Sequence, residues 1–127
     1  MIRIVGLGPD GPEGMSVAAR EALRAASLIM GPGAEGLSRL VLRTDRHPAA
    51  AFLTQEGIPY STCDHLYDEL PDFDAVYRAI SERIITLAAD GDVTYAVPGH
   101  PCVGEESVRL IRERADAAGI PVEIIGS

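Results

Sequence analysis

The sequence predicts an α/β fold: an open, three-layer sheet of about five mostly parallel strands with helices on both faces. Two observations support this prediction. Short apolar runs bounded by Gly or Pro are typical of strands that are buried on both faces of a parallel sheet. Segments with helical spacing separate these runs, and such alternation favours parallel strands joined by right-handed crossovers.

The elements before residue 63 follow from short apolar runs. In chain order they are a strand, a helix, a strand, a short helix and a weaker strand: Ile2–Val5, a helix after Ser16 with Val17, Leu23 and Ala26 as apolar positions, Leu40–Leu42, a helix from near Pro48 to Gly57, and Ile58–Tyr60. The last strand is weaker because Pro59 cannot donate to a ladder. Leu28–Met30 fits either a strand or the end of the first helix, and Gly31–Gly36 fits a flexible excursion.

The elements after residue 71 have clearer signals. They are expected as helix, strand, helix and strand at about Phe73–Ala89, Val93–Val97, about Glu105–Ala118, and Val122–Ile125. The first of these helices places six apolar residues on one face: Phe73, Val76, Tyr77, Ile80, Ile84 and Leu87. Asp72 suits its N-cap and Gly91 its C-terminal end. The acidic segment Cys63–Pro71 is expected to be a loop with a helical turn.

The length, charge and cysteine content of the chain disfavour several classes of function. The chain has 127 residues, enough for one domain, and a formal net charge of −8. An acidic surface disfavours both nucleic acid and an anionic membrane as partners, and no apolar run approaches the ~20 residues that cross a bilayer. Because the chain has only two cysteines, Cys63 and Cys102, and no signal-peptide anatomy, we expect a cytoplasmic protein with reduced thiols.

The first loop that could carry chemistry is Gly6–Gly14, directly after the first strand. Its opening matches G-x-G-x-x-G, but Pro9 and Pro12 each remove an N–H that a dinucleotide pyrophosphate would need. A dinucleotide site is therefore less favoured than two alternatives. These are a tight turn without a ligand and a loop that lets a planar or bulky ligand approach the backbone.

The second loop, Val97–Gly104, lies between a buried strand and a helix, and its two prolines and two glycines restrict the backbone. Rigid loops at the carboxyl end of a strand position ligands well. His100 fits an acid–base group, a donor or a structural residue equally well. We expect no metal site, because His100 with Cys102 supplies too few ligands and Cys63-Asp64-His65 lacks further partners.

The third loop, Leu42–Pro48, gathers two arginines, a threonine and a histidine in a chain with few cations. This pattern indicates an anion or carboxylate site. A solvated turn in which His47 caps the residues before the next helix explains it equally well. No Ser/His/Asp set, Walker loop or carboxylate pair stands out, so no catalytic residue is assigned.

These three loops together resemble the tetrapyrrole (corrin/porphyrin) methylases, which use S-adenosylmethionine. The resemblance rests on Gly6–Ser16, and it is sharpened by Leu42–Pro48 and Tyr95–Glu105, which are similar to the branch fused to a MazG-type nucleotide pyrophosphohydrolase. It implies two α/β domains with the active site between them, so residues 1–127 would be the N-terminal half. A C-terminal methylase domain and a MazG-type domain would then be partners within a longer polypeptide. The segment from Met30 to Leu40 is longer than that pattern.

The resemblance also implies roles for individual residues. The cofactor side of the cleft would be formed by Pro98, Gly99, His100, Pro101 and Val103, and the side facing a planar, tetrapyrrole-like substrate by Gly8, Pro9, Thr44, Arg46 and His47. His100 stands where the family has the acidic residue of Gly-Asp-Pro. Methyl transfer requires an enzyme to hold donor and acceptor in the right geometry and does not require a nucleophile from the protein. The absence of a recognisable set of catalytic residues is therefore consistent with methyl transfer.

Two functions follow from these observations. One is half of an S-adenosylmethionine-dependent methyltransferase, with too little of the site to be active alone. The other is a non-catalytic small-molecule-binding or regulatory module attached to a nucleotide pyrophosphohydrolase, which His100 favours. We also expect the exposed cleft face to favour a homodimer.

Overall fold

Five parallel strands form one sheet with the order β3-β2-β4-β1-β5. The computed structural model describes residues 1–26, 39–103 and 105–126. Its strands are β1 Ile2–Gly6, β2 Leu40–Leu42, β3 Ser61–Thr62, β4 Val93–Val97 and β5 Val122–Ile125. Its helices are α1 Val17–Ala26, α2 Ala50–Glu56, α3 Asp64–Glu69, α4 Phe73–Ala89 and α5 Glu106–Ala118, with a short 3-10 turn at Pro12–Gly14.

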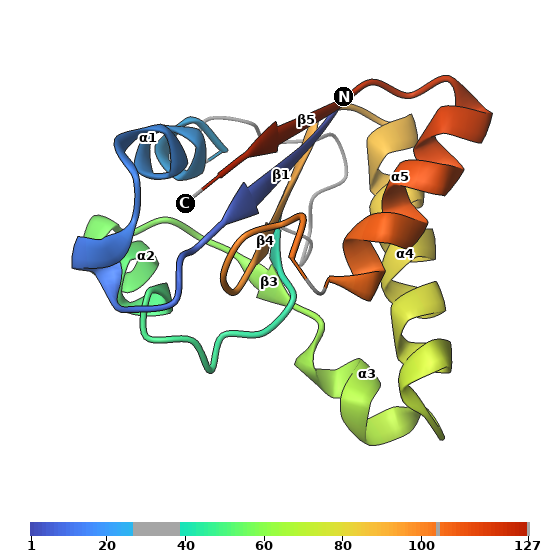
Figure 1. Cartoon of the computed structure of the whole chain (residues 1–127), viewed down its shortest axis with the longest axis horizontal. Coiled ribbons are helices and arrows are strands. Elements are labelled where there is room, and N and C mark those ends of the chain that lie inside the picture. The colour runs from blue at the N-terminus through green and yellow to red at the C-terminus, as the bar shows by residue number, and fades with distance from the viewer. Residues whose placement is uncertain (27–38, 104, 127) are drawn as a thin grey trace.

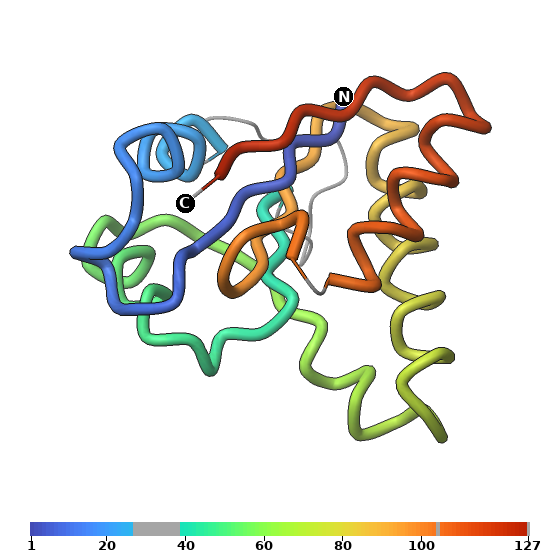
Figure 2. Tube along the Cα trace, viewed as in Figure 1, coloured from blue at the N-terminus to red at the C-terminus, as the bar shows by residue number. Residues whose placement is uncertain are grey.

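The sheet lies between two helical layers, which confirms the predicted three-layer architecture. Figure 1 shows α1 and α2 on one side of the strands, and α3, α4 and α5 on the other. The same arrangement of the chain can be followed in Figure 2. All five strands run parallel, so the expected mostly parallel sheet is entirely parallel in the described part of the chain.

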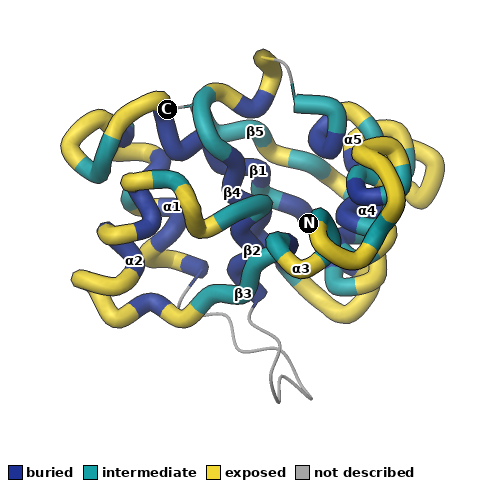
Figure 3. Tube along the Cα trace, turned by 90° about the horizontal axis from the view of Figure 1, so that it is seen from below, coloured by how far each residue is buried: buried dark blue, intermediate teal, exposed yellow. Residues whose placement is uncertain are grey.

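Two apolar clusters, one on each face of the sheet, form the core. Val5, Leu23 and Leu53 belong to the cluster beneath α1 and α2. Ile4 and Ile84 belong to the one beneath α4 and α5. Burial on both faces explains why apolar residues predominate in the central strands β1, β2 and β4, and Figure 3 shows these strands as the buried centre of the molecule.

Local signals fix most helix ends where the sequence predicts them. The Asp72 carboxylate accepts a hydrogen bond from the Ala75 amide at 2.8 Å and caps α4. The Ser16 hydroxyl accepts one from the Ala19 amide at 3.0 Å at the start of α1. Gly57 and Gly119 end α2 and α5 in left-handed conformations, with φ of 66° and 70°.

Two predictions need correction. The weak strand expected at Ile58–Tyr60 forms at Ser61–Thr62 instead, because the buried Ile58 packs against the α2 cluster and its amide bonds to Leu53. The helical turn expected within the segment 63–71 is present as α3, Asp64–Glu69. Phe73, expected on the apolar face of α4, is 67% exposed. Leu28–Met30 and the excursion at 31–36 lie outside the described residues.

Arg83 of α4 anchors the short edge strand β3. Its guanidinium donates to the Thr62 carbonyl at 2.7 Å and to the Ser61 hydroxyl at 2.7 Å. These bonds compensate for the brevity of a two-residue strand. Within the described ranges, no helix has the length and apolar character needed to span a membrane.

Candidate functional site

The loops after β1 and β4 are joined to each other at the carboxyl edge of the sheet. Gly8 and Gly99 exchange two backbone hydrogen bonds, each 3.1 Å long, in an isolated antiparallel bridge. Both glycines have positive φ, 76° and 68°, which an L side chain rarely adopts. A Cβ built on Gly99 would meet no atom within 4 Å. Gly8 is buried and Gly99 is half-buried, so Gly99 leaves open space at the edge where open α/β sheets bind ligands.

The loop from Pro98 to Val103 carries the predicted cofactor residues. Pro98 and Gly99 are half-buried, Pro101 is buried, and His100 and Val103 are exposed. The Val103 amide donates to the His100 carbonyl at 3.1 Å, which closes the turn. The structure thus places all five predicted residues on one short, hydrogen-bonded loop beside Gly8.

The His100 ring has a defined tautomer and position. Its Nδ1 accepts a hydrogen bond from the Cys102 amide at 3.1 Å, so the proton of the neutral ring is on Nε2. Nε2 lies 3.0 Å from where a Cβ on Gly126 would be, so the ring packs directly over the end of β5. The Gly126 carbonyl in turn accepts from the Ser16 hydroxyl at 2.9 Å. His100 therefore presents an N–H donor towards the end of β5, at the position where the resemblance described above implied an acidic acceptor.

The β2 loop, with the predicted Thr44, Arg46 and His47, reaches the same edge. The Arg43 amide bonds to the Ala96 carbonyl of β4 at 2.9 Å, which extends the pairing of these strands into the loop. The Thr44 hydroxyl accepts from the Arg46 amide at 3.2 Å, and Arg46 is exposed. The His47 Nδ1 atom accepts a hydrogen bond from the Ala49 amide at 3.0 Å. His47 therefore has the capping role that we gave above as the alternative to an anion site. Pro9 is exposed next to Gly8.

Arg43, which was not among the predicted site residues, forms the centre of a polar network behind this edge. Its guanidinium lies 3.2 Å from Glu105 and donates to the Tyr67 hydroxyl at 2.8 Å. Glu105 accepts from the Ser107 hydroxyl at 3.1 Å, and that hydroxyl also lies 2.8 Å from the buried Tyr95 hydroxyl. The network connects the β2 loop, α3, β4 and the start of α5. The sequence indicated a carboxylate site at the two arginines of this loop, but it did not indicate that the carboxylate paired with Arg43 is Glu105 of the same chain.

Burial dominates the electrostatics of this network. The Arg43 and Glu105 side chains are 21% and 11% exposed. Burial raises the pKa of Glu105 above its ordinary 4.5, although Arg43 and Ser107 oppose the shift. Burial also raises the pKa of Tyr95 well above 10.0. Hydrogen bonding to Tyr67 and attraction to Glu105 raise the pKa of Arg43, against the effect of its burial. Arg43 is thus committed to Glu105 and Tyr67 rather than to a ligand.

A carboxylate pair, which the sequence did not single out, lies beside Thr44. The Asp64 carboxylate accepts from the Asp45 amide at 3.1 Å. Burial and the neighbouring Asp64 raise the pKa of Asp45. Burial opposes ionisation of Asp64, but the hydrogen bonds from Thr44, from the Asp45 amide and from Thr62 together lower the pKa of this carboxyl group. Among residues 1–26, 39–103 and 105–126, no group of three or more His, Cys, Asp or Glu side chains has the arrangement to hold a metal ion.

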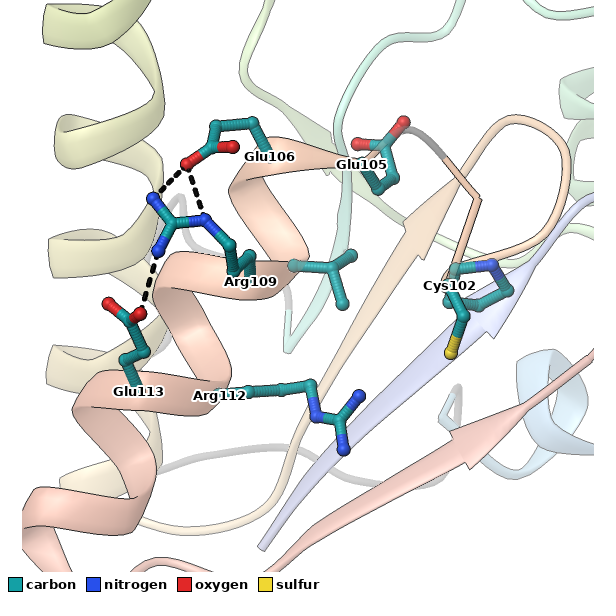
Figure 4. A pocket seen from close by; sticks show the side chains of 8 residues that line it. Cys102, Glu105, Glu106, Arg109, Arg112 and Glu113 are labelled. Atoms are coloured by element: carbon teal, nitrogen blue, oxygen red, sulfur yellow. Dashed lines mark hydrogen bonds and ion pairs between the residues drawn. The ribbon is translucent and has the colours of Figure 1, made fainter.

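A groove of about 560 Å³ borders the loop on its α5 side, lined by Pro101, Cys102, Glu105, Glu106, Val108, Arg109, Arg112 and Glu113. Figure 4 shows the Arg109 guanidinium between Glu106 and Glu113, whereas Arg112 extends into the opening. Both cysteines of the chain are free thiols, with Cys63 buried and Cys102 exposed on this groove.

Relatives and solved structures share this architecture. Residues 1–126 match the profile of the Tetrapyrrole (Corrin/Porphyrin) Methylases. The chain is 31% identical over 125 residues to the uncharacterized protein YabN of Bacillus subtilis (strain 168), an alignment that covers 98% of this chain and 23% of YabN.

A crystal structure of uroporphyrin-III-C-methyltransferase from Thermus thermophilus matches with a TM-score of 0.67 and 21% identity, over 99% of this chain and 46% of that one. Another structure of that enzyme, complexed with S-adenyl homocysteine, matches with a TM-score of 0.58 and 17% identity, over 99% and 47%.

At these identities the solved structures show a shared fold, and the chain spans less than half the length of each of these relatives. The match over residues 1–126, together with the entirely parallel five-stranded sheet, shows that the chain belongs to the tetrapyrrole methylase family, and is a domain related to S-adenosylmethionine-dependent methyltransferases.

Proposed function

We propose that the carboxyl edge of this sheet is one wall of an S-adenosylmethionine-dependent methyltransferase site for a planar, tetrapyrrole-like acceptor. The observation that carries the proposal is the Gly8–Gly99 bridge, because it joins two loops from distant parts of the chain and leaves the half-buried Gly99 open beside the buried Gly8. A surface without side chains lets a flat ligand lie close to the backbone. The space above Gly99 fits a bound cofactor, since a Cβ there would meet nothing within 4 Å.

S-adenosylmethionine supplies an electrophilic methyl group on a sulfonium, which an acceptor removes by in-line displacement. The chain's own residues contribute position rather than a nucleophile. Pro98, Gly99, Pro101 and Val103 hold the cofactor side of the wall, while Gly8, Pro9, Thr44 and Arg46 face the acceptor. His47 lies at the far end of the acceptor side, where it also fixes the start of the α2 turn.

Residues 1–127 supply one of the two walls in this proposal. A C-terminal methylase domain would complete the cleft, and the chain alone would bind the cofactor weakly and lack activity. A cytoplasmic location with reduced Cys63 and Cys102, and a homodimer formed through the exposed cleft face, belong to the same proposal. Nucleic acid and membrane surfaces remain disfavoured as partners by the net charge of −8.

Calorimetry on the full-length protein tests the methyltransferase proposal. We expect heat of binding with S-adenosylmethionine and with S-adenosylhomocysteine, and an affinity at least tenfold weaker for residues 1–127 alone. The variant His100→Asp should bind S-adenosylmethionine more tightly, because a carboxylate can pair with the ammonium of the methionine part and can still accept from the Cys102 amide. His65→Asp, the same change at an exposed histidine on α3, is the matched control.

A non-catalytic role is favoured by one observation. His100 presents its Nε2–H donor at the position where the resemblance implied an acidic acceptor. The chain would then be a non-catalytic small-molecule-binding or regulatory module of a MazG-type nucleotide pyrophosphohydrolase. Absence of heat with both cofactor forms, in the native protein and in His100→Asp, would reject the methyltransferase and leave this module. Its own test is whether the full-length protein hydrolyses nucleoside triphosphates to monophosphates and pyrophosphate.

A further inference from the structure

The junction of α3 and α4 carries an aromatic cluster in which Tyr67 and Tyr77 pack against the core, and no residue of this cluster is assigned to the cofactor or the acceptor. The Tyr67, Phe73 and Tyr77 rings lie 6.2–6.5 Å apart, with Phe73 stacked on Tyr77 and Tyr67 edge-on to both. Half of the six aromatic residues of the chain are therefore in one place. Phe73 is 67% exposed, one of three large apolar side chains in the described ranges that face solvent to this extent.

A hollow of about 340 Å³ opens beside these rings, lined by Tyr67, Leu70, Pro71, Asp72, Phe73 and Val76. Its walls are held in place before any partner arrives. The Tyr67 hydroxyl accepts from Arg43 at 2.8 Å, and the Asp72 carboxylate accepts from the Ala75 amide at 2.8 Å. Preorganised walls lower the entropic cost of binding, so this hollow has the character of a docking surface for a partner's side chain.

The carboxylates around the hollow indicate which charge a partner would carry. Residues 64–74 contain five carboxylates and no Arg or Lys: Asp64, Asp68, Glu69, Asp72 and Asp74. Asp68, Glu69, Asp72 and Asp74 are exposed. An acidic rim around exposed aromatic faces attracts cations, and arginine is preferred because its guanidinium both stacks on rings and pairs with carboxylates.

A second copy of the chain fits this surface poorly. An isologous contact through Phe73 would place the two acidic rims against each other.

We propose that the surface formed by Tyr67, Leu70, Phe73 and the acidic rim docks a cationic segment of another protein, in which arginines flank an apolar anchor. The anchor side chain fills the hollow, and the arginines pair with the rim and stack on the rings. This follows the mode in which an amphipathic helix binds a groove. It is independent of the methyltransferase proposal, because it uses none of the residues assigned to the cofactor or the acceptor.

The test uses the full-length protein and a synthetic amphipathic peptide with leucines at helical spacing flanked by arginines, measured by fluorescence anisotropy. We expect the peptide to bind, and its counterpart with glutamate in place of each arginine to bind at least tenfold more weakly. Phe73→Ala should weaken binding at least tenfold. The pair Asp68→Asn with Glu69→Gln should weaken binding and reduce its dependence on salt.

Matched variants separate docking from general attraction to an acidic chain. Val17→Ala removes another exposed apolar side chain, and Glu13→Gln with Glu21→Gln neutralises two exposed carboxylates elsewhere. Both should leave the peptide affinity within twofold. The proposal is overturned if these controls weaken binding as much as the α3–α4 variants, or if Phe73→Ala has no effect. It is also overturned if Phe73 mediates concentration-dependent dimerisation in light scattering, since the surface would then belong to a second copy.

Discussion

Gly99→Ala probes the bridge at the centre of the proposed site, and Gly57→Ala is its matched control. The two glycines have nearly the same φ, 68° and 66°, and a Cβ on either would meet no atom within 4 Å. Gly99 lies at the carboxyl edge of the sheet beside Gly8, whereas Gly57 ends α2 at the opposite edge. The two substitutions therefore impose the same backbone strain at two different places.

The expected loss of stability follows from this geometry. Holding an L residue in the left-handed region costs roughly 1–2 kcal/mol. Alanine also reduces the freedom of the unfolded chain, which offsets part of that cost. We expect each variant to lose about 1 kcal/mol, equivalent to a fall in melting temperature of about 3–6 °C for a domain of this size. Gly99→Asn should lose less than Gly99→Ala, because asparagine tolerates the left-handed region better.

The binding measurement separates the two positions. Calorimetry with S-adenosylhomocysteine on the full-length protein should show an affinity at least tenfold lower for Gly99→Ala, because its methyl group projects into the space assigned to the cofactor. Gly57→Ala should leave the affinity within twofold. Equal affinities for the two variants would refute the assignment of Gly99 to the cofactor wall. A loss of several kcal/mol in Gly99→Ala alone would refute the inference that the space above it is open.

Three further perturbations test the interactions that support the site. Arg43→Met leaves Glu105 buried without its cation, so we expect a loss of about 2–3 kcal/mol at pH 7 in urea unfolding. Burial raises the pKa of Glu105 above 4.5, so ionisation of Glu105 lowers the free energy of unfolding of the native protein. The stabilisation that protonated Glu105 provides is full below pH 4.5 and is lost as the pH rises through the raised pKa. The loss in Arg43→Met should therefore shrink as the pH falls towards 4.5, and a pH-independent loss would contradict the pairing. Arg83→Met removes the two 2.7 Å bonds to β3 and should speed amide exchange in that strand at a cost of about 1–3 kcal/mol, whereas Arg78→Met, on the exposed side of α4, should not. Ser16→Ala removes both the α1 cap and the bond to the Gly126 carbonyl; a loss of about 1–2 kcal/mol in thermal unfolding is expected, and no loss would mean that β5 is held without it.

Sequence periodicity was sufficient for the strands and helices that form the core. The runs that become β1, β2 and β4 are rich in apolar residues because both faces of these central strands are covered, and the partly buried edge strand β5 packs apolar residues against both clusters. Helix ends were predictable where a single residue carries the signal, as Asp72 and Gly119 do. The strand β3 was misplaced by three residues, because a two-residue strand has no periodicity and its position depends on Arg83 of a distant helix.

The alternation of strands and helices and the three rigid loops could be predicted from the sequence, because those properties depend on residues close together in the chain. Which residues meet one another depends on how the strands and helices pack. The tertiary structure joins Gly8 to Gly99, withdraws Arg43 from the edge to pair with Glu105, and turns Phe73 outward. Each of these outcomes depends on the order β3-β2-β4-β1-β5, which brings together segments that are far apart in sequence and that no local pattern relates to one another.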